Sequence, residues 1–331
     1  MNITIIIPVY NAQPFLKECL DSVYKQTYKD WRCLIVNDGS TDESQSIIDE
    51  YCAKDKRFNF VFKENEKSAA KARAFAFDYI NSEWVIFVDA DDTIAVDCIE
   101  KLTARQEETG ADIVVGRRVG CSIDLKEELW RIPTDNFDMS RILTGREACS
   151  LTLGGWQIGG ITLFKRDLDK GLVAGAYMNS DEYLERLRLL RANKVAFVDA
   201  NYYFRKNIGT SDMISVRMFD RTLVDMQLEK FVLHNFSDNE KIIKTLTWQR
   251  LFNLIYLEAD YKKNRIIFTN EERKHIVRIL KQSYNGLHRL RTIRYVPKHA
   301  WMTLFPHALF GFLAECYVEY KRNNGGTFYY R

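Results

Sequence analysis

Long uncharged hydrophobic runs, closely spaced cysteine pairs and N-terminal histidines are all missing from this 331-residue sequence. No uncharged stretch reaches the roughly 18 residues that a membrane-spanning helix needs. The first residues lack the basic region and cleavage site of a signal peptide. The seven cysteines include no C-x-x-C pair, which disfavours a disulfide framework or a zinc cluster and indicates reduced thiols. We therefore expect a cytoplasmic protein that is soluble or attached to a membrane from one side.

The motif content and the charge of the sequence also disfavour some classes of function. No G-x-G-x-x-G follows the first predicted strand, which disfavours a dinucleotide-dependent dehydrogenase. The net charge of +3 is too small to indicate nucleic acid as a partner, and the content of 46% hydrophobic and 28% charged residues is ordinary for a globular protein. The positive charge is concentrated late in the chain, because residues 281–331 contain eight Lys and Arg against two Glu. This basic tail indicates an anionic partner.

The hydrophobic pattern of the first 200 or so residues alternates between two kinds of segment. Short runs rich in β-branched and aromatic residues predict strands, and amphipathic segments predict helices. The expected strands are residues 3–8, 31–36, 58–62, 84–88, 112–115 and 195–198, and the expected helices begin near Pro14, Ser40, Ser68 and Asp181. This alternation predicts an α/β fold with a mainly parallel sheet covered by helices on both faces. We expect a catalytic domain at residues 1–206 and a mostly helical region at 207–331.

A cluster of carboxylates follows one of the predicted strands. Residues 84–93 read W-V-I-F-V-D-A-D-D-T, so a short apolar run ends in Asp89, Asp91 and Asp92. Such charge repels itself unless a cation offsets it, and Mg²⁺ or Mn²⁺ shared with a phosphate-bearing ligand suits carboxylate oxygens. Zinc is disfavoured here because all five histidines lie at or beyond residue 234. Since ligands bind beyond the carboxyl ends of parallel strands, Tyr10, Asp38 and Asp89 should share one crevice.

Three segments resemble the successive motifs of family 2 glycosyltransferases with the GT-A fold. They read I-I-I-P-V-Y-N at residues 5–11, V-N-D-G-S-T-D at 36–42 and F-V-D-A-D-D at 87–92, and a fourth element lies at residues 181–182. The resemblance covers about residues 1–206. It implies a GT-A fold, a nucleotide-sugar donor (UDP-linked in most such enzymes), a divalent metal and inversion at the sugar carbon. It also suggests a role in bacterial surface-polysaccharide assembly.

The resemblance further implies roles for individual residues. Tyr10 and Asp38 would bind the nucleotide base, and Arg73 would face the nucleotide. Asp89 would contact the ribose, and Asp91 would bind the metal. The complete set implied for nucleotide-sugar binding is Pro8, Tyr10, Asp38, Arg73, Asp89, Ala90 and Asp91.

A carboxylate at the start of a later helix is implied as the base that deprotonates the acceptor hydroxyl. The family usually has Glu followed by Asp there, whereas this sequence has Asp181 followed by Glu182, so both are candidate catalytic residues. One base without a separate nucleophile gives a single displacement and therefore inversion. A second departure follows Arg73, where residues 72–76 read A-R-A-F-A in place of the family's A-R-N-x-G. Trp156, in a glycine-rich loop at 154–160, could stack on the acceptor sugar or belong to the core.

Other interpretations of these residues stay open. The D-A-D-D-T at residues 89–93 also fits the D-x-D-x-T signature of haloacid-dehalogenase phosphatases, in which the first Asp is a nucleophile. That signature normally follows the first strand of its domain, whereas here it follows about the fourth. A third interpretation is a catalytically inactive nucleotide-sugar-binding module, which the departures at residues 74, 76 and 182 would explain. Each charged residue could also have a purely structural role, such as helix capping.

Two interpretations of the basic tail also stay open. Arg289, Arg291, Arg294 and Lys298 precede two aromatic and aliphatic stretches at residues 301–305 and 309–313. Cations beside such residues are typical of a helix that lies on an anionic bilayer, in which case the acceptor may be a lipid-linked glycan. The alternative is a basic helical subdomain packed against the catalytic domain.

Overall fold

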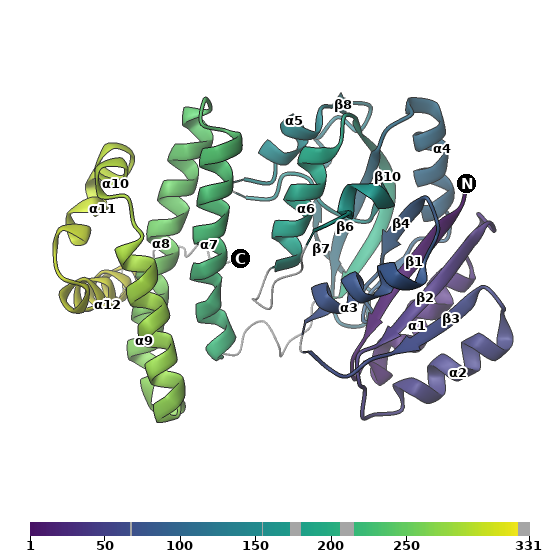
Figure 1. Cartoon of the computed structure of the whole chain (residues 1–331), viewed down its shortest axis with the longest axis horizontal. Coiled ribbons are helices and arrows are strands. Elements are labelled where there is room, and N and C mark those ends of the chain that lie inside the picture. Colours follow the sequence, from purple (N-terminus) through teal and green to yellow (C-terminus); the bar gives the residue numbers. More distant parts are fainter. Residues whose placement is uncertain (67, 154, 173–179, 206–214, 324–331) are drawn as a thin grey trace. The chain divides into compact units, whose positions relative to one another are not determined.

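The computed structural model describes residues 1–66, 68–153, 155–172, 180–205 and 215–323. Its chain divides into two compact units, which are described separately (Figure 1). Unit 1 comprises residues 1–176 and 180–212, and unit 2 comprises residues 177–179 and 213–331. The predicted domain boundary at residues 206–207 lies outside the described residues.

The described part of unit 1 is built around one mixed sheet. Its strands are β1 (Ile3–Val9), β2 (Trp31–Asn37), β3 (Phe58–Phe62), β4 (Trp84–Phe87), β5 (Thr93–Ile94), β6 (Ile113–Cys121), β7 (Glu128–Ile132), β8 (Ile142–Leu143), β9 (Thr162–Lys165) and β10 (Val195–Arg205). The spatial order is β3-β2-β1-β4-β9-β6-β10-β5, with β7 beside β6 and β8 beside β10. The first four strands in this order are parallel, as are β6 and β10. Strand β9 runs antiparallel between β4 and β6.

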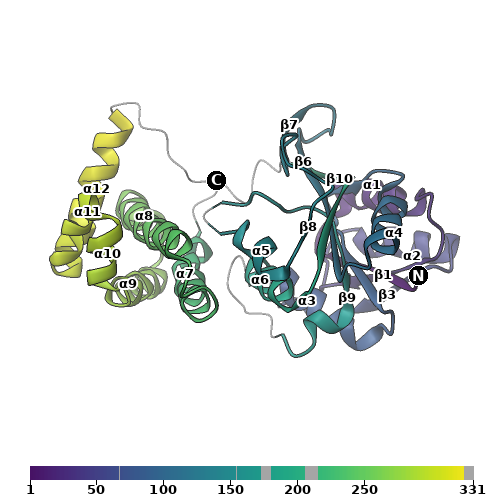
Figure 2. The same cartoon turned by 90° about the horizontal axis from the view of Figure 1, so that it is seen from above.

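Helices cover both faces of this sheet. They are α1 (Gln13–Tyr24), α2 (Ser44–Lys54), α3 (Ala69–Ala76), α4 (Cys98–Thr109), α5 (Gly145–Ser150) and α6 (Ser180–Arg191), with short 3-10 helices η1 (Phe77–Tyr79) and η2 (Arg166–Asp169). Helices α1, α2 and α4 lie on one face, and α3, α5 and α6 lie on the other (Figure 2). Coverage on both faces explains why β1 is an almost continuous run of buried apolar residues.

The predicted α/β fold with a helical C-terminal region is confirmed. The structure adds β5, β7, β8 and β9, and it extends the strands predicted at residues 112–115 and 195–198 into β6 and β10. Polar residues interrupt the apolar run in both extensions, joined by glycines in β6, so the apolar pattern ends before each strand does. Gly116 shows why a glycine is needed within β6, because a Cβ there would lie 2.5 Å from the carbonyl oxygen of Ala200 on β10. The glycine permits the close approach of the two backbones.

The described residues of unit 2 form helices joined by short turns. Its elements are α7 (Val216–Asn235), α8 (Glu240–Asn264), η3 (Arg265–Ile267), α9 (Asn270–Asn285), α10 (Arg289–Tyr295), α11 (Pro297–Ala300), η4 (Trp301–Leu304) and α12 (His307–Asn323). Helix α8 is the centre of its core and contacts α7, α9, α10 and α12. Among the described helices, none combines the length and the apolar composition needed to cross a membrane.

Candidate active site

The carboxyl ends of β1, β2 and β3 form the first part of the site. Tyr10 directly follows β1 and is 53% exposed, whereas Asp38 directly follows β2 and is buried. Lys63, which follows β3, donates a hydrogen bond from Nζ to Asp38 Oδ1 at 2.8 Å. Burial opposes the charge of Lys63, but its hydrogen bonds to Asp38 and Glu66 outweigh this effect and raise its pKa. Tyr10 and Asp38 were predicted from the sequence as site residues, whereas Lys63 was not.

A tight turn after β2 presents Asp38. Gly39 adopts a φ of +73°, and a Cβ there would lie 3.0 Å from the backbone nitrogen of Asn65. Glycine is therefore favoured both by the backbone conformation and by the space available. The loop after β1 braces the turn, because Asn11 Oδ1 accepts a hydrogen bond from the backbone N–H of Thr41 at 2.8 Å.

The three aspartates after β4 lie in different environments. Asp89 and Asp91 are partly exposed, whereas Asp92 is only 1% exposed. Asp92 accepts hydrogen bonds from the Tyr202 hydroxyl and from the backbone N–H of Arg205. Burial, together with the charges of Asp89 and Asp91, raises the pKa of Asp92 to about 8. Asp92 is therefore held by hydrogen bonds to β10, whereas the predicted metal ligand, Asp91, is partly exposed.

The end of β10 holds the aspartate turn in place. The Asp89 backbone N–H donates to the Tyr202 hydroxyl at 3.2 Å, and Arg205 Nε donates to the Asp91 carbonyl oxygen at 2.9 Å. Arg205 also forms an ion pair with Glu18 of α1 at 2.6 Å. These roles of Tyr202 and Arg205 were missed because the apolar pattern of the strand ends at residue 198.

Arg73 connects predicted site residues from three elements. Its guanidinium on α3 forms an ion pair with Asp89 after β4, and a second pair with Asp181 on α6 at 3.6 Å. Burial opposes the charge of Arg73, but Asp89 and Asp181 outweigh it and raise its pKa. Burial likewise opposes ionisation of Asp89, yet the Arg73 charge keeps the pKa of Asp89 below its usual value. The structure therefore brings Arg73, Asp89 and Asp181 together as charged groups.

The two candidate bases lie in the first turn of α6 but make different contacts. Asp181 faces Arg73, whereas Glu182 lies 3.6 Å from the Arg186 guanidinium in the next turn of the helix. Arg186 is buried, and its Cζ lies 4.7 Å from the centre of the half-buried Trp156 ring. Glu182 and Trp156 are therefore both associated with Arg186, and Asp181 with Arg73.

A further cation was not identified from the sequence. Arg118 on β6 is close enough to Asp89 for its charge to contribute to the lowered pKa of that carboxyl, after the larger effects of burial and Arg73. Its Nε is buried without a hydrogen-bond partner in the part of the chain that the structure describes. A buried guanidinium N–H of this kind suits an anionic ligand.

The remaining predicted residues belong to the same motifs. Pro8 lies within β1 and pairs in register with Val36 of β2, and Ala90 is buried between Asp89 and Asp91. Neither side chain offers a polar group, so any contribution to ligand binding comes from the backbone or from packing.

The donor set at this edge suits a metal shared with a ligand better than a metal caged by protein. No group of three or more His, Cys, Asp or Glu side chains among the described residues is placed to hold a metal ion. Asp91 is partly exposed beside Asp89. Magnesium and manganese commonly bind one or two carboxylates together with substrate phosphates and water, which fits this arrangement.

Comparisons with known proteins agree with this geometry. The sequence profile of Glycosyl transferase family 2 matches residues 4–172. Glycosyltransferase GlyG of Streptococcus pneumoniae is 26% identical over 244 residues, which cover 71% of this chain and 78% of GlyG. The matched residues include all three N-terminal motifs, whereas the phosphatase interpretation accounts for the D-x-D-x-T element alone.

Solved structures share the fold. S. aureus TarS residues 1–349 align with a TM-score of 0.69 and 17% identity over 100% of this chain and 93% of that one, and TarS has also been solved with UDP-GlcNAc. The mannosyltransferase PcManGT of Pyrobaculum calidifontis, solved with GDP-Man and Mn²⁺, aligns with a TM-score of 0.50 and 16% identity over 95% of this chain and 85% of that one.

Replacing Tyr202 with Phe should destabilise unit 1. The change removes a donor to buried Asp92 and the acceptor of the Asp89 N–H, and an unsatisfied buried polar group costs about 1–3 kcal/mol. We expect the free energy of unfolding, measured by urea denaturation, to fall by that amount. Tyr203→Phe is the matched control, because no hydrogen bond of the Tyr203 hydroxyl is found among the described residues, and it should change stability by less than about 0.5 kcal/mol. Equal stability of the two variants would show that these bonds do not hold the turn.

Proposed function

Because the chain belongs to Glycosyl transferase family 2, we propose that this glycosyltransferase moves a sugar from a UDP-sugar to a hydroxyl of a glycan or lipid-linked glycan, with inversion at the sugar carbon. The main observation in support is the charged group formed by Arg73, Asp89 and Asp181, which come from three separate elements. Such a meeting of a guanidinium and two carboxylates beyond the ends of parallel strands is typical of a ligand site.

The donor would lie across the ends of β1, β2 and β4. The exposed ring of Tyr10 offers a stacking surface for the base, and the Asp38 carboxylate can accept a hydrogen bond from a base N–H. The Asp89 carboxylate can accept hydrogen bonds from ribose hydroxyls. Arg73 and Arg118 supply positive charge for the diphosphate, since guanidinium groups bind phosphate oxygens in pairs.

Asp91 is the residue proposed to hold Mg²⁺ or Mn²⁺ together with oxygens of the donor diphosphate. The cation would offset the negative charge that builds on the diphosphate as the bond to the sugar breaks. The Arg205 side chain donates a hydrogen bond to the backbone carbonyl oxygen of Asp91, so the Asp91 carboxylate is attached to an anchored backbone.

Asp181 is the better placed of the two candidate bases. It shares Arg73 with Asp89, whereas Glu182 is paired with Arg186, which also bonds to Thr152. In the proposed step, Asp181 takes the proton of the acceptor hydroxyl while the hydroxyl oxygen forms a bond to the sugar carbon. The bond from that carbon to the diphosphate breaks on the opposite side, and the electron pair leaves with the UDP. Trp156 remains a proposed acceptor contact.

Replacing Asp91 with Asn should remove metal-dependent transfer. We expect release of UDP from a UDP-sugar in the presence of Mn²⁺ to fall by about 10²–10³-fold, the size typical of lost charge stabilisation in a transition state. Asp49→Asn on the outer helix α2 makes the same chemical change away from the site and should leave release unchanged. EDTA should abolish the native activity in the same assay. Substantial turnover by the Asp91 variant, or native turnover in EDTA, would contradict the metal role.

Replacing each candidate base separately should identify which one acts. We expect Asp181→Asn to lower kcat by about 10²–10⁴-fold, the usual contribution of general base catalysis, and Glu182→Gln to lower it less than tenfold. Calorimetric titration with UDP and Mn²⁺ reports whether each variant keeps its donor site, since Asp181 also contacts Arg73. The opposite ranking would assign the base to Glu182. If the native protein binds UDP but neither transfers nor hydrolyses any UDP-sugar, it is an inactive binding module.

We also propose that unit 2 attaches the protein to an anionic membrane surface. Large apolar side chains are exposed close together in sequence on η4, on α12 and in the turn between them, namely Trp301, Leu304, Phe305, Leu309 and Phe312. Basic residues precede them on α10 and α11. Aromatic and aliphatic side chains beside cations favour the interface of a bilayer with anionic lipids.

Two substitutions on η4 and α12 test this attachment. Trp301→Ser combined with Phe312→Ser should reduce flotation with vesicles containing phosphatidylglycerol, because both side chains would lose apolar contact with the lipid. Ile266→Ser combined with Ile267→Ser is the control, because it removes two apolar side chains of η3 that are more exposed than the tested pair. The proposal fails if neither the native protein nor the control floats, or if both double variants float equally well.

A further inference from the structure

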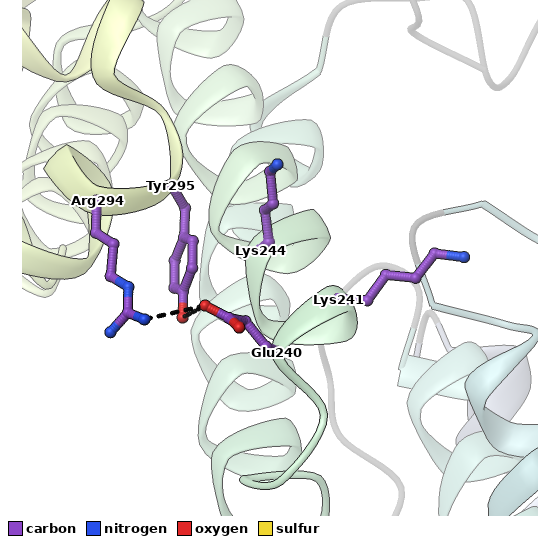
Figure 3. Close-up of a pocket in the computed structure, with 5 residues that line it drawn as sticks. All are labelled: Glu240, Lys241, Lys244, Arg294 and Tyr295. Atoms are coloured by element: carbon purple, nitrogen blue, oxygen red, sulfur yellow. Dashed lines mark hydrogen bonds and ion pairs between the residues drawn. The ribbon is translucent and has the colours of Figure 1, made fainter.

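Unit 2 contains a cavity that the donor site does not use. It has a volume of about 470 Å³ and lies between the start of α8 and α10 (Figure 3). Glu240, Lys241 and Lys244 line it from α8, and Arg294 and Tyr295 line it from α10. Three of these five residues are cationic, so the cavity carries a positive charge.

The one carboxylate of the cavity does not neutralise its lysines. Glu240 Oε1 accepts hydrogen bonds from Arg294 at 3.1 Å and from the Tyr295 hydroxyl at 3.2 Å. Within the described residues, neither the Lys241 nor the Lys244 ammonium has a carboxylate at ion-pair distance. Like charges three residues apart on a helix repel each other, so a bound anion would relieve this repulsion.

The face of α8 that carries the two lysines continues beyond the cavity to an exposed aromatic residue. From residue 241 to 250, the exposed residues are Lys241, Lys244 and Trp248, at positions i, i+3 and i+7 of one helix face. The Trp248 ring is 40% exposed and stacks on Phe252 with a centroid distance of 4.3 Å. Two lysines therefore share one face of α8 with an aromatic ring that is stacked on Phe252.

The charge of the chain is divided between its two units. Residues 213–331 contain 20 Lys and Arg against 11 Asp and Glu, whereas residues 1–212 contain 28 against 34. A net positive unit attracts an anionic partner over a distance, and a concave cluster of cations provides the place where it binds. An uncharged glycan would gain nothing from either feature.

We propose that the cavity lined by Lys241, Lys244 and Arg294 binds phosphate groups of an anionic acceptor, a chain of polyol or sugar phosphodiesters. This rests on the proposed transferase function, because it assigns the class of molecule that receives the sugar. A phosphodiester chain repeats its charge every few ångströms and can enter a concave site. A bilayer surface engages protruding side chains, and the exposed apolar residues of unit 2 that suit it lie on η4 and α12 instead.

The test uses the full chain and two double variants of equal charge change. Lys241→Ala with Lys244→Ala removes the cavity cations, and Lys230→Ala with Lys281→Ala removes two exposed lysines of α7 and α9. The probes are short poly(glycerol phosphate), uncharged dextran of similar length, and vesicles containing phosphatidylglycerol. Binding is measured at two salt concentrations, and the affinity of each variant for UDP with Mn²⁺ checks that unit 1 is intact.

We expect the native protein to bind poly(glycerol phosphate), more weakly at high salt, and not to bind dextran. The cavity variant should lose on the order of tenfold in affinity for the polymer, the size of two charge-assisted contacts at a solvated site, and the control variant much less. Equal losses in both variants would assign binding to net charge and overturn the proposal. The proposal would also be overturned if the native protein did not bind the polymer, whether or not it bound the vesicles. If the native protein does not bind UDP with Mn²⁺, the proposed function is refuted, and the polymer result can still be interpreted by itself.

Discussion

Electrostatic repulsion among the three aspartates after β4 is the constraint around which unit 1 is arranged. Asp92 is buried and takes hydrogen bonds from the end of β10, and Asp89 is paired with Arg73. These two carboxylates are thus satisfied by the protein. Asp91 lies between them on a backbone anchored by Arg205, at the position proposed for the metal and the diphosphate. The same three residues therefore divide into a structural, a bridging and a proposed ligand-binding role.

Arg73 links this turn to the helix that carries the candidate bases. Its two carboxylate partners lie 92 positions apart in the sequence, at residue 89 in the turn after β4 and at residue 181 on α6. Because a buried guanidinium is costly without partners, the pairs stabilise α3 and α6 against the strand ends. Donor phosphates would add to the charges that Arg73 and Arg118 already face. The position of the proposed base would then be coupled to the position of the proposed donor.

The two units use their charges differently. In unit 1 the cations Lys63, Arg73 and Arg205 are matched by carboxylates, which places opposing charges at defined positions beyond the strand ends. In unit 2 the cavity beside α8 exposes lysines that no carboxylate of the described residues neutralises. Opposing charges in contact favour precise positioning of a small ligand, whereas unpaired exposed cations favour loose association with a long anion. This contrast agrees with a donor site on unit 1 and an acceptor contact on unit 2.

Hydrophobic periodicity was sufficient to predict the α/β fold, because β1, β2 and β4 are buried on both faces and so consist of short apolar runs. The motif residues Tyr10, Asp38 and Asp89 could be placed at one edge for the same reason, since parallel strands end together. The inward position of Asp92, the role of Tyr202 and the pairing of Lys63 with Asp38 could not be predicted. These contacts join residues 25 to 110 positions apart, and they depend on strand register and side-chain packing. Only the tertiary structure distinguishes Asp181 from Glu182, because neighbours on a helix point in directions about 100° apart and so meet different partners.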